Sequence, residues 1–150
     1  MKRLFLATLA ATATLASTGT FAQFQKPEDA VKYRKSAFQV MSAHFGRLGA
    51  MASGRAAYDA ASASANAEIV AFMSKLPYAG FVEGTSGTEK GSPKANVWTE
   101  RAKFDEDAKK MQDEVAKLAV AAKGGPDALK TAFGAAAGAC KNCHDHFRNP

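Results

Sequence analysis

The chain's two cysteines and a histidine stand close together near the C-terminus, in the run Cys140-Lys141-Asn142-Cys143-His144. Cys-x-x-Cys-His is the attachment motif of c-type haem. On a helix, residues three and four apart share a face. Both thiols can therefore form thioethers with the vinyl groups of one haem, while the His144 imidazole approaches the iron from the same side. The spacing predicts one covalent haem c per chain, with His144 as the axial metal ligand.

The alternative is a disulfide or redox-active cysteine pair with a histidine nearby by chance. A thioredoxin-like dithiol is expected beside a βαβ unit, whereas the residues before Cys140 form an alanine-rich, helix-like segment. Haem attachment is therefore favoured. Once haem takes Cys140 and Cys143, no cysteine is left for a disulfide framework.

Residues 1–22 resemble a secretory signal peptide. Lys2 and Arg3 are followed by an apolar stretch over residues 4–15, and residues 20–22 offer small side chains at the positions that a signal peptidase inspects. The apolar stretch is too short to span a bilayer. We expect residues 23–150 to be an exported, single-domain mature chain that does not insert into a membrane.

The formal net charge of +6 does not indicate a nucleic-acid-binding protein. Between residues 100 and 110 the basic residues are interspersed with acidic ones, as on a solvated helix face. No cluster of basic and aromatic residues supports nucleic-acid binding.

The mature chain carries four segments with helical periodicity and no strand pattern. The first begins near Pro27 and ends before residues 53–54, and the second runs from about residue 58 or 59 to 75, where Pro77 stops it. Residues 77–95 are rich in Gly, Ser, Thr and Pro and predict a long loop. Asn96 is the expected cap of the third helix, and residues 124–126 separate it from the fourth. The prediction is an all-α, antiparallel four-helix bundle with the covalent haem in its core.

The apolar stripe of the fourth helix, which includes Phe133, leads directly into the haem motif. A haem motif at the end of a four-helix chain, together with the segments at residues 26–34, 98–104, 132–134 and 140–148, resembles cytochrome c′, the C-terminal-haem class of cytochromes c. The resemblance covers essentially the whole mature chain. It implies a pentacoordinate, high-spin iron with His144 as its only protein ligand, selective binding of NO and CO, a periplasmic location and a homodimer. It implies no agreed enzymatic turnover.

Phe38 is the residue that decides between the possible haem sites. In the resembled family, the position four after the first-helix arginine, here Arg34, lies over the open face of the haem. Low-spin relatives carry Met there, and its sulfur becomes the sixth ligand. A phenyl group has no lone pair for iron, so we expect an occluded distal face that admits NO and disfavours CO.

Met41 follows three residues later and could be a hidden sixth ligand, although a Met at helical spacing is typical of core packing. His44 lies off the centre of the stripe and is interpreted as a surface residue. His146 faces nearly the opposite side of the helix from His144 and cannot bind the same iron.

The resemblance assigns further residues to the haem pocket. Arg148 is expected beside His144, where it could donate hydrogen bonds to a bound diatomic, unless it is a solvated arginine at a frayed terminus. Arg34 and Lys35 are possible partners of the haem propionates. Trp98 and Phe104, with Phe133, are expected to line the pocket, although aromatic core residues need no cofactor to explain them.

Two functions remain open from the sequence. The first is an NO-binding haem protein, possibly in NO protection, and the second is a periplasmic electron carrier with a redox partner. Replacement of the Met ligand by Phe38 favours gas binding, because electron transfer is helped by a six-coordinate iron. Catalysis is disfavoured, since the apolar stripe above the haem offers no acid–base group.

Overall fold

The computed structural model describes residues 23–150, so the predicted signal peptide at 1–22 lies outside the described part of the chain. Its four long helices are α1 (Pro27–Ala52), α2 (Ala60–Met73), α4 (Arg101–Ala121) and α5 (Pro126–Phe147). Two short elements interrupt the connection between α2 and α4: the 3₁₀ helix η1 (Pro77–Gly80) and the single helical turn α3 (Asn96–Thr99).

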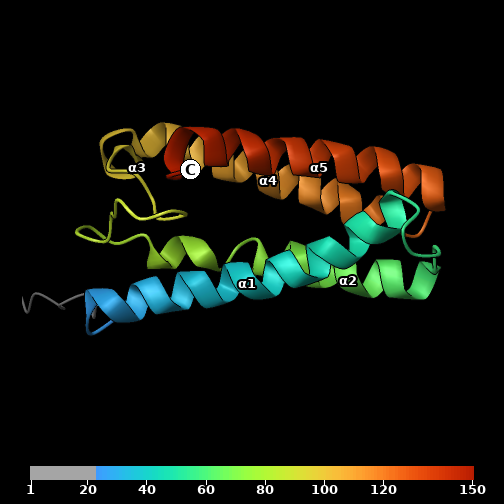
Figure 1. Cartoon of the computed structure of the whole chain (residues 1–150), viewed down its shortest axis with the longest axis horizontal. Helices are drawn as coiled ribbons and strands as arrows, with labels where there is room; N and C mark the ends of the chain where they lie inside the picture. The colour runs from blue at the N-terminus through green and yellow to red at the C-terminus, as the bar shows by residue number, and fades with distance from the viewer. Residues whose placement is uncertain (1–22) are drawn as a thin grey trace, which may run out of the picture.

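The four long helices form the predicted antiparallel four-helix bundle. Consecutive helices form two hairpins, α1 with α2 and α4 with α5, and the hairpins meet through contacts of α1 with α5 and of α2 with α4. Figure 1 shows α4 and α5 running along one side of the molecule and α1 and α2 along the other. The start of α1, the end of α5 and the connection between α2 and α4 gather at the same end.

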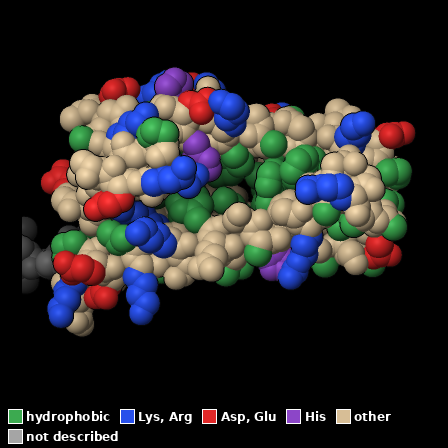
Figure 2. Space-filling model, in the orientation of Figure 1, with side chains coloured by type: hydrophobic (Ala, Val, Ile, Leu, Met, Phe, Trp, Pro, Cys, Tyr) green, Lys and Arg blue, Asp and Glu red, His purple; other side chains and the backbone are tan. Residues whose placement is uncertain are grey.

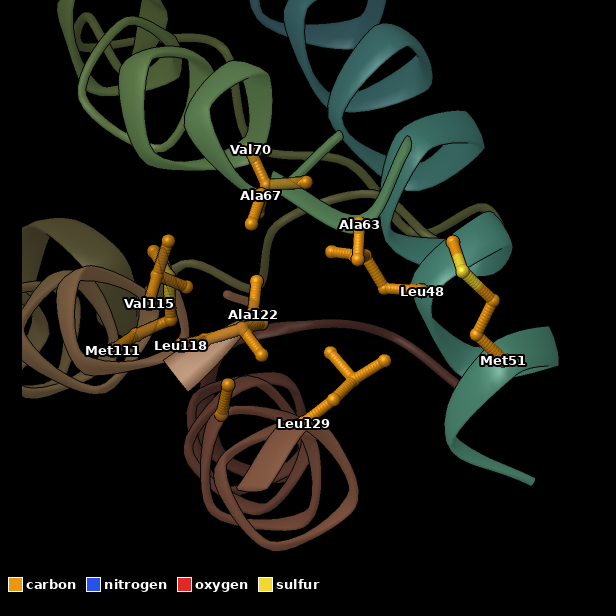
Figure 3. Close-up of a cluster of buried hydrophobic side chains, with 11 residues drawn as sticks. Leu48, Met51, Ala63, Ala67, Val70, Met111, Val115, Leu118, Ala122 and Leu129 are labelled. Atoms are coloured by element: carbon orange, nitrogen blue, oxygen red, sulfur yellow. The ribbon is translucent and has the colours of Figure 1, made fainter. Parts of the chain in front are cut away.

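The main hydrophobic core occupies the other half of the bundle and takes side chains from every long helix. Leu48 from α1, Val70 from α2, Leu118 from α4 and Leu129 from α5 are all essentially inaccessible to solvent. Figure 3 shows these residues and the alanines Ala63, Ala67 and Ala122 pointing toward the space between the helices. Burial of side chains such as Leu48 and Leu118 contributes about 1.5–3 kcal/mol each.

Close packing against α5 explains why a glycine, Gly49, stands in the last turns of α1. A Cβ atom at this position would lie 2.8 Å from Cζ of Phe133, whose ring stacks on Phe45 with centroids 4.5 Å apart. The missing side chain allows the Phe133 ring to pack against the backbone of α1. Helix α1 therefore continues through Gly46 and Gly49 to Ala52.

The helix ends follow ordinary capping rules, with one exception. Pro27 occupies the first turn of α1, and the Asp59 side chain accepts a hydrogen bond from the Ser62 amide at 2.7 Å to cap α2. The expectation that Asn96 caps a continuous third helix is wrong. Asn96 begins the separate turn α3, and Glu100, with φ −116° and ψ 40°, breaks the helix before α4. The Asn96 side chain does not cap a helix but donates to the carbonyl of His146, at 3.3 Å.

Among residues 23–150, no helix is both long enough and apolar enough to cross a membrane.

Candidate functional site

A cavity of about 770 Å³ lies between α1, the end of α5 and the long connection between α2 and α4. Figure 2 shows a hollow of this face floored by apolar side chains, with Lys, Arg and His side chains beside it. Helix α5 lines the cavity with Cys140, Cys143 and His144, and α1 lines it with Phe38 and Met41. The predicted attachment motif and the predicted distal residue thus border one space.

Cys140, Cys143 and His144 share the cavity-facing side of the last two turns of α5, as their spacing predicts. Burial raises the pKa of both thiols; for Cys143 it reaches about 11, with the negative charge of Asp107 as the next cause. Redox-active cysteines instead have lowered pKa values. The thiols therefore lack the electrostatics of a catalytic dithiol, which was the alternative interpretation.

The pKa of His144 is lowered, first by desolvation and then by the positive charge of Arg148. This shift favours the neutral imidazole, which is the form that binds a metal. Arg148 thus lies close enough to act on His144 electrostatically, as the resemblance implies.

The cavity fits a haem in size and in chemistry. Its volume is within the range of about 300–1,000 Å³ found for cofactor sites. Such a space is far larger than the voids normally left in a protein interior. Its wall is mainly aromatic and aliphatic, which suits the faces of a macrocycle, and its charged lining residues are exposed apart from the buried Arg34. Two thiols and one imidazole on the same helix face supply the groups that attach the macrocycle and bind its iron.

A chain of aromatic rings forms much of the cavity wall. Phe38 from α1 meets Phe81 edge to face, with centroids 6.3 Å apart, and Phe81 packs on Phe104 at 4.9 Å. Phe104 in turn packs on Phe147 at 5.3 Å, and Tyr78 contacts both Phe81 and Phe104. Phe104 therefore lies where we expected it. Phe81 and Tyr78 were not predicted, because the connection that carries them has no periodicity.

Arg34 lines the cavity, but its guanidinium is already engaged with the connection between α2 and α4. Nη1 donates to the Gly80 carbonyl at 2.8 Å and to Thr85 Oγ1 at 2.6 Å, and Nη2 donates to the Thr85 carbonyl at 2.6 Å. The guanidinium also lies over the Phe81 ring, 4.8 Å from its centroid. Burial lowers the pKa of Arg34. Its principal role in this structure is to clamp residues 80–85, which hold Phe81 against the cavity.

The last residues of the chain are not frayed, because residues 91–94 pair with residues 147–149. The Lys94 amide donates to the Phe147 carbonyl at 2.9 Å. The Gly91 amide donates to the Asn149 carbonyl at 3.0 Å, and the Asn149 amide donates to the Ser92 carbonyl at 2.9 Å. Arg148 is the first residue after α5, in an extended conformation, and it forms an isolated bridge with Pro93. Its side chain lines the cavity against Gly91, where a Cβ atom would lie 3.0 Å from the Arg148 guanidinium.

Met41 and Lys35 also line the cavity, whereas two of the three histidines lie elsewhere. Met41 is half-buried and packs against the main core. Lys35 is exposed. His44 contacts the Asn66 side chain at 2.8 Å, so it joins α1 to α2. His146 is exposed and faces Asp107, away from the cavity.

Trp98 and Phe133 were expected to line the pocket, and the structure places them outside it. Because α3 is separated from α4, Trp98 packs against the small cluster of Val97, Phe104 and Phe147 behind the cavity wall. Phe133 lies about two turns before the motif and fills the space beside Gly49 in the main core.

Five basic side chains surround the opening, and we call them the basic rim. Lys35, Lys141 and Arg148 border the main cavity, while Lys90 and Lys94 border an adjoining hollow of about 400 Å³ that shares His144 with it. Asp145 is the acidic side chain among the lining residues, and Lys141 pairs with it at 2.5 Å. The rim therefore carries net positive charge around the predicted axial ligand.

Comparison with known proteins agrees with this geometry. A family model described as cytochrome C′ matches residues 29–148. The cytochrome c′ of Alcaligenes xylosoxydans xylosoxydans is 45% identical over 127 residues, covering 84% of this chain and 98% of the relative. That of Rubrivivax gelatinosus is 46% identical over 127 residues, with the same coverage of 84% and 98%.

Solved structures of such relatives share the fold. The crystal structure of Rubrivivax gelatinosus cytochrome c′ superposes with a TM-score of 0.78 at 44% identity, covering 85% of this chain and 100% of that one. A nitric oxide complex of a leucine-to-alanine variant of the Alcaligenes xylosoxidans protein gives a TM-score of 0.78 at 43% identity, covering 85% and 99%. The family carries a covalent c-type haem. From the helical bundle, the C-terminal haem motif and these matches, we conclude that the chain belongs to the cytochrome c′ family.

Proposed function

We propose that the protein binds nitric oxide at a haem whose distal side is closed by aromatic side chains. The observation that carries this proposal is Phe38. It lies on the α1 wall of the cavity, in edge-to-face contact with Phe81, while the attachment motif lies on the α5 wall. Neither ring can coordinate iron, and together they restrict the space beside it. A relative in this family has been solved as a nitric oxide complex.

Each residue of the site has a distinct part in this proposal. Cys140 and Cys143 would attach the haem and His144 would bind its iron, while burial and then the charge of Arg148 bias His144 toward the neutral, ligating form. Bound haem supplies an iron with a free sixth position that accepts a diatomic ligand. Phe38 and Phe81 select by the strength of the iron–ligand bond, because a weakly held ligand such as CO gains too little to displace packed rings. We assign no catalytic turnover, since neither ring can transfer a proton.

Absorption and EPR spectra of the purified holoprotein, with and without NO, test the proposal. We expect a high-spin, five-coordinate resting spectrum, a change on adding NO, and weak CO binding. Phe38→Ala should strengthen CO binding, and Phe38→Met should convert the resting spectrum to low spin. A Ser36→Ala change, at an exposed position of α1 outside the cavity lining, should alter neither property. A low-spin resting spectrum of the native protein, or CO affinity like that of an open-pocket myoglobin, would contradict the proposal.

Electron transfer is the alternative function, and the basic rim is the observation that favours it. Lys35, Lys90, Lys94, Lys141 and Arg148 place positive charge around the cavity opening, where an acidic redox partner could dock. A six-coordinate iron would suit electron transfer better than the five-coordinate iron that we expect beside Phe38. The resting spectrum therefore distinguishes the two functions.

We also infer that the protein works in the periplasm in protection against NO, and that it is a homodimer. The predicted export signal supports the location. Apolar side chains on α1 and α2 support the dimer: Phe72 is 66% exposed, Val40 is 44% exposed and Ile69 is 37% exposed. Ile69 and Phe72 share a face of α2, because they are three residues apart. A second copy of this chain would cover this surface.

Sedimentation equilibrium of the holoprotein tests the dimer. Phe72→Glu should yield a monomer with an unchanged haem spectrum, because Phe72 is remote from the cavity lining. Val120→Glu is the matched control, since Val120 is 77% exposed on α4. Equal masses for the two variants would argue against an interface on α2.

A further inference from the structure

Asp107 is a buried carboxylate that gas binding does not require. It lies on α4, three residues after Phe104 and four before Met111, and both neighbours line the cavity. Because residues at these spacings lie near one another on a helix, Asp107 lies beside the cavity-lining stripe of α4, although it does not itself line the cavity. Its side chain is 1% exposed. The sequence alone suggested a solvated acid here, because Asp107 stands in a mixed run of charged residues.

The negative charge of Asp107 is only partly compensated. Lys103 donates to Oδ1 at 2.5 Å, but the Lys103 side chain is 43% exposed and is therefore screened by water. Oδ2 is buried and accepts no hydrogen bond within residues 23–150, and Nδ1 of His146 lies 3.5 Å from it. Burial alone would raise the pKa of Asp107, yet the hydrogen bond and charge of Lys103, with a smaller contribution from His146, lower it. Asp107 is therefore a carboxylate anion at neutral pH.

Asp107 lies close to the haem-attachment motif. Its Oδ2 is 3.5 Å from Nδ1 of His146, which stands two residues after His144 on α5. Cys143 packs against the cluster that contains Phe104 and Phe147, and Phe104 is one turn before Asp107 on α4. Helices α4 and α5 are also the most extensively contacting pair in the bundle.

We propose that Asp107 sets the reduction potential of the haem by holding a fixed negative charge beside the attachment site. Adding an electron to the haem lowers its net positive charge by one. A nearby anion stabilises the ferric form relative to the ferrous form and so lowers the potential. Lys103 opposes this effect by neutralising part of the anion. The inference holds whether the protein binds gas or transfers electrons.

Spectroelectrochemical titration of the holoprotein at pH 8 tests the proposal. Asp107→Asn should raise the ferrous-to-ferric ratio at a fixed applied potential by about threefold to tenfold, where tenfold corresponds to a 59 mV rise in midpoint potential. Lys103→Gln should shift the ratio in the opposite direction, because it leaves the buried anion without its partner. Loss of structure alone would not produce opposite shifts.

Lys109 and Asp113 provide the matched controls. They form an ion pair with the same spacing on the same helix, but both side chains are more than half exposed. Lys109→Gln and Asp113→Asn should each leave the potential unchanged. Shifts of the same sign in the two Lys103–Asp107 variants, or an equal shift in Asp113→Asn, would overturn the proposal. If Asp107→Asn does not accumulate as holoprotein, Lys103→Gln decides: a fall in potential supports the proposal and no change overturns it.

Discussion

Replacing Arg34 by Met should loosen the wall of the haem cavity and destabilise the protein. The substitution keeps a long, unbranched side chain but removes three hydrogen bonds of 2.6–2.8 Å and the contact over Phe81. The carbonyls of Gly80 and Thr85 lose their guanidinium donors. Thr85 Oγ1 keeps its own bond to the Val82 carbonyl at 2.7 Å.

The expected loss follows from these contacts. Hydrogen bonds to a charged group contribute about 1.5–3 kcal/mol each, and the cation–π contact adds about 0.5–1 kcal/mol. Removing a buried charge offsets part of this sum, because its desolvation cost is several kcal/mol. We therefore expect Arg34→Met to lower the free energy of unfolding by about 3 kcal/mol.

Urea unfolding of the holoprotein, followed by far-ultraviolet circular dichroism, measures this loss. With a slope of about 1–3 kcal/mol per molar urea, the midpoint should fall by about 1–3 M. Arg47→Met is the matched control on the same helix. Arg47 is exposed, and its contacts with His44 and Asn66 are 3.4 Å long, so its loss should stay within about 0.5 kcal/mol.

Hydrogen exchange and CO binding then locate the effect. Amides of residues 80–85 should exchange faster in Arg34→Met, while those of the main core should change only by the global loss of stability. Association of CO should accelerate, because Phe81 is no longer held. An Arg34→Met protein as stable as Arg47→Met, with unchanged exchange in residues 80–85, would refute the role of Arg34 as a clamp.

Two further predictions concern packing and pH. Gly49→Ala should destabilise the protein by about 1–3 kcal/mol in urea unfolding, because the new Cβ would lie 2.8 Å from Phe133. Gly46→Ala, which meets nothing within 4 Å, should instead stabilise it by about 1 kcal/mol, and destabilisation by both changes would contradict this explanation. The pKa of Asp107 is lowered in the folded state, so its stabilising effect is present above the unfolded value near 3.9 and is lost as pH falls through the folded value. Unfolding free energies of the native protein and Asp107→Asn should therefore converge with acidification, and a constant difference between pH 7 and pH 2 would count against it.

Much of the fold and the centre of the site could be predicted from the sequence because they depend on local spacing. Apolar residues at helical intervals predict the four long helices, and the spacing of Cys140, Cys143 and His144 places them on one face. Helical spacing put Phe38 on the inward stripe of a regular helix, and the resemblance to cytochrome c′ then placed it over the haem. In each case the residues whose relative positions were predicted lie on a single helix.

The remaining features depend on contacts between distant parts of the chain. Phe81 reaches the cavity only because Arg34, some fifty residues earlier, holds its loop. Trp98 leaves the cavity wall because the helix breaks at Glu100, where no proline or glycine marks the break. Asp107 is buried although its neighbours in sequence are charged. Its distances of three and four residues from Phe104 and Met111 were the available signal for this burial.

The basic rim also distinguishes the two possible functions by their dependence on salt. Nitric oxide carries no charge, so its rate of association gains nothing from the positive potential around Lys35 and Lys90 and should not vary with ionic strength. Docking of an acidic redox protein would be accelerated by that potential at low salt. The acceleration should decline as the Debye length shortens from about 30 Å at 0.01 M to about 8 Å at 0.15 M ionic strength. The rim would thus affect encounters with proteins while leaving the entry of small neutral gases unchanged.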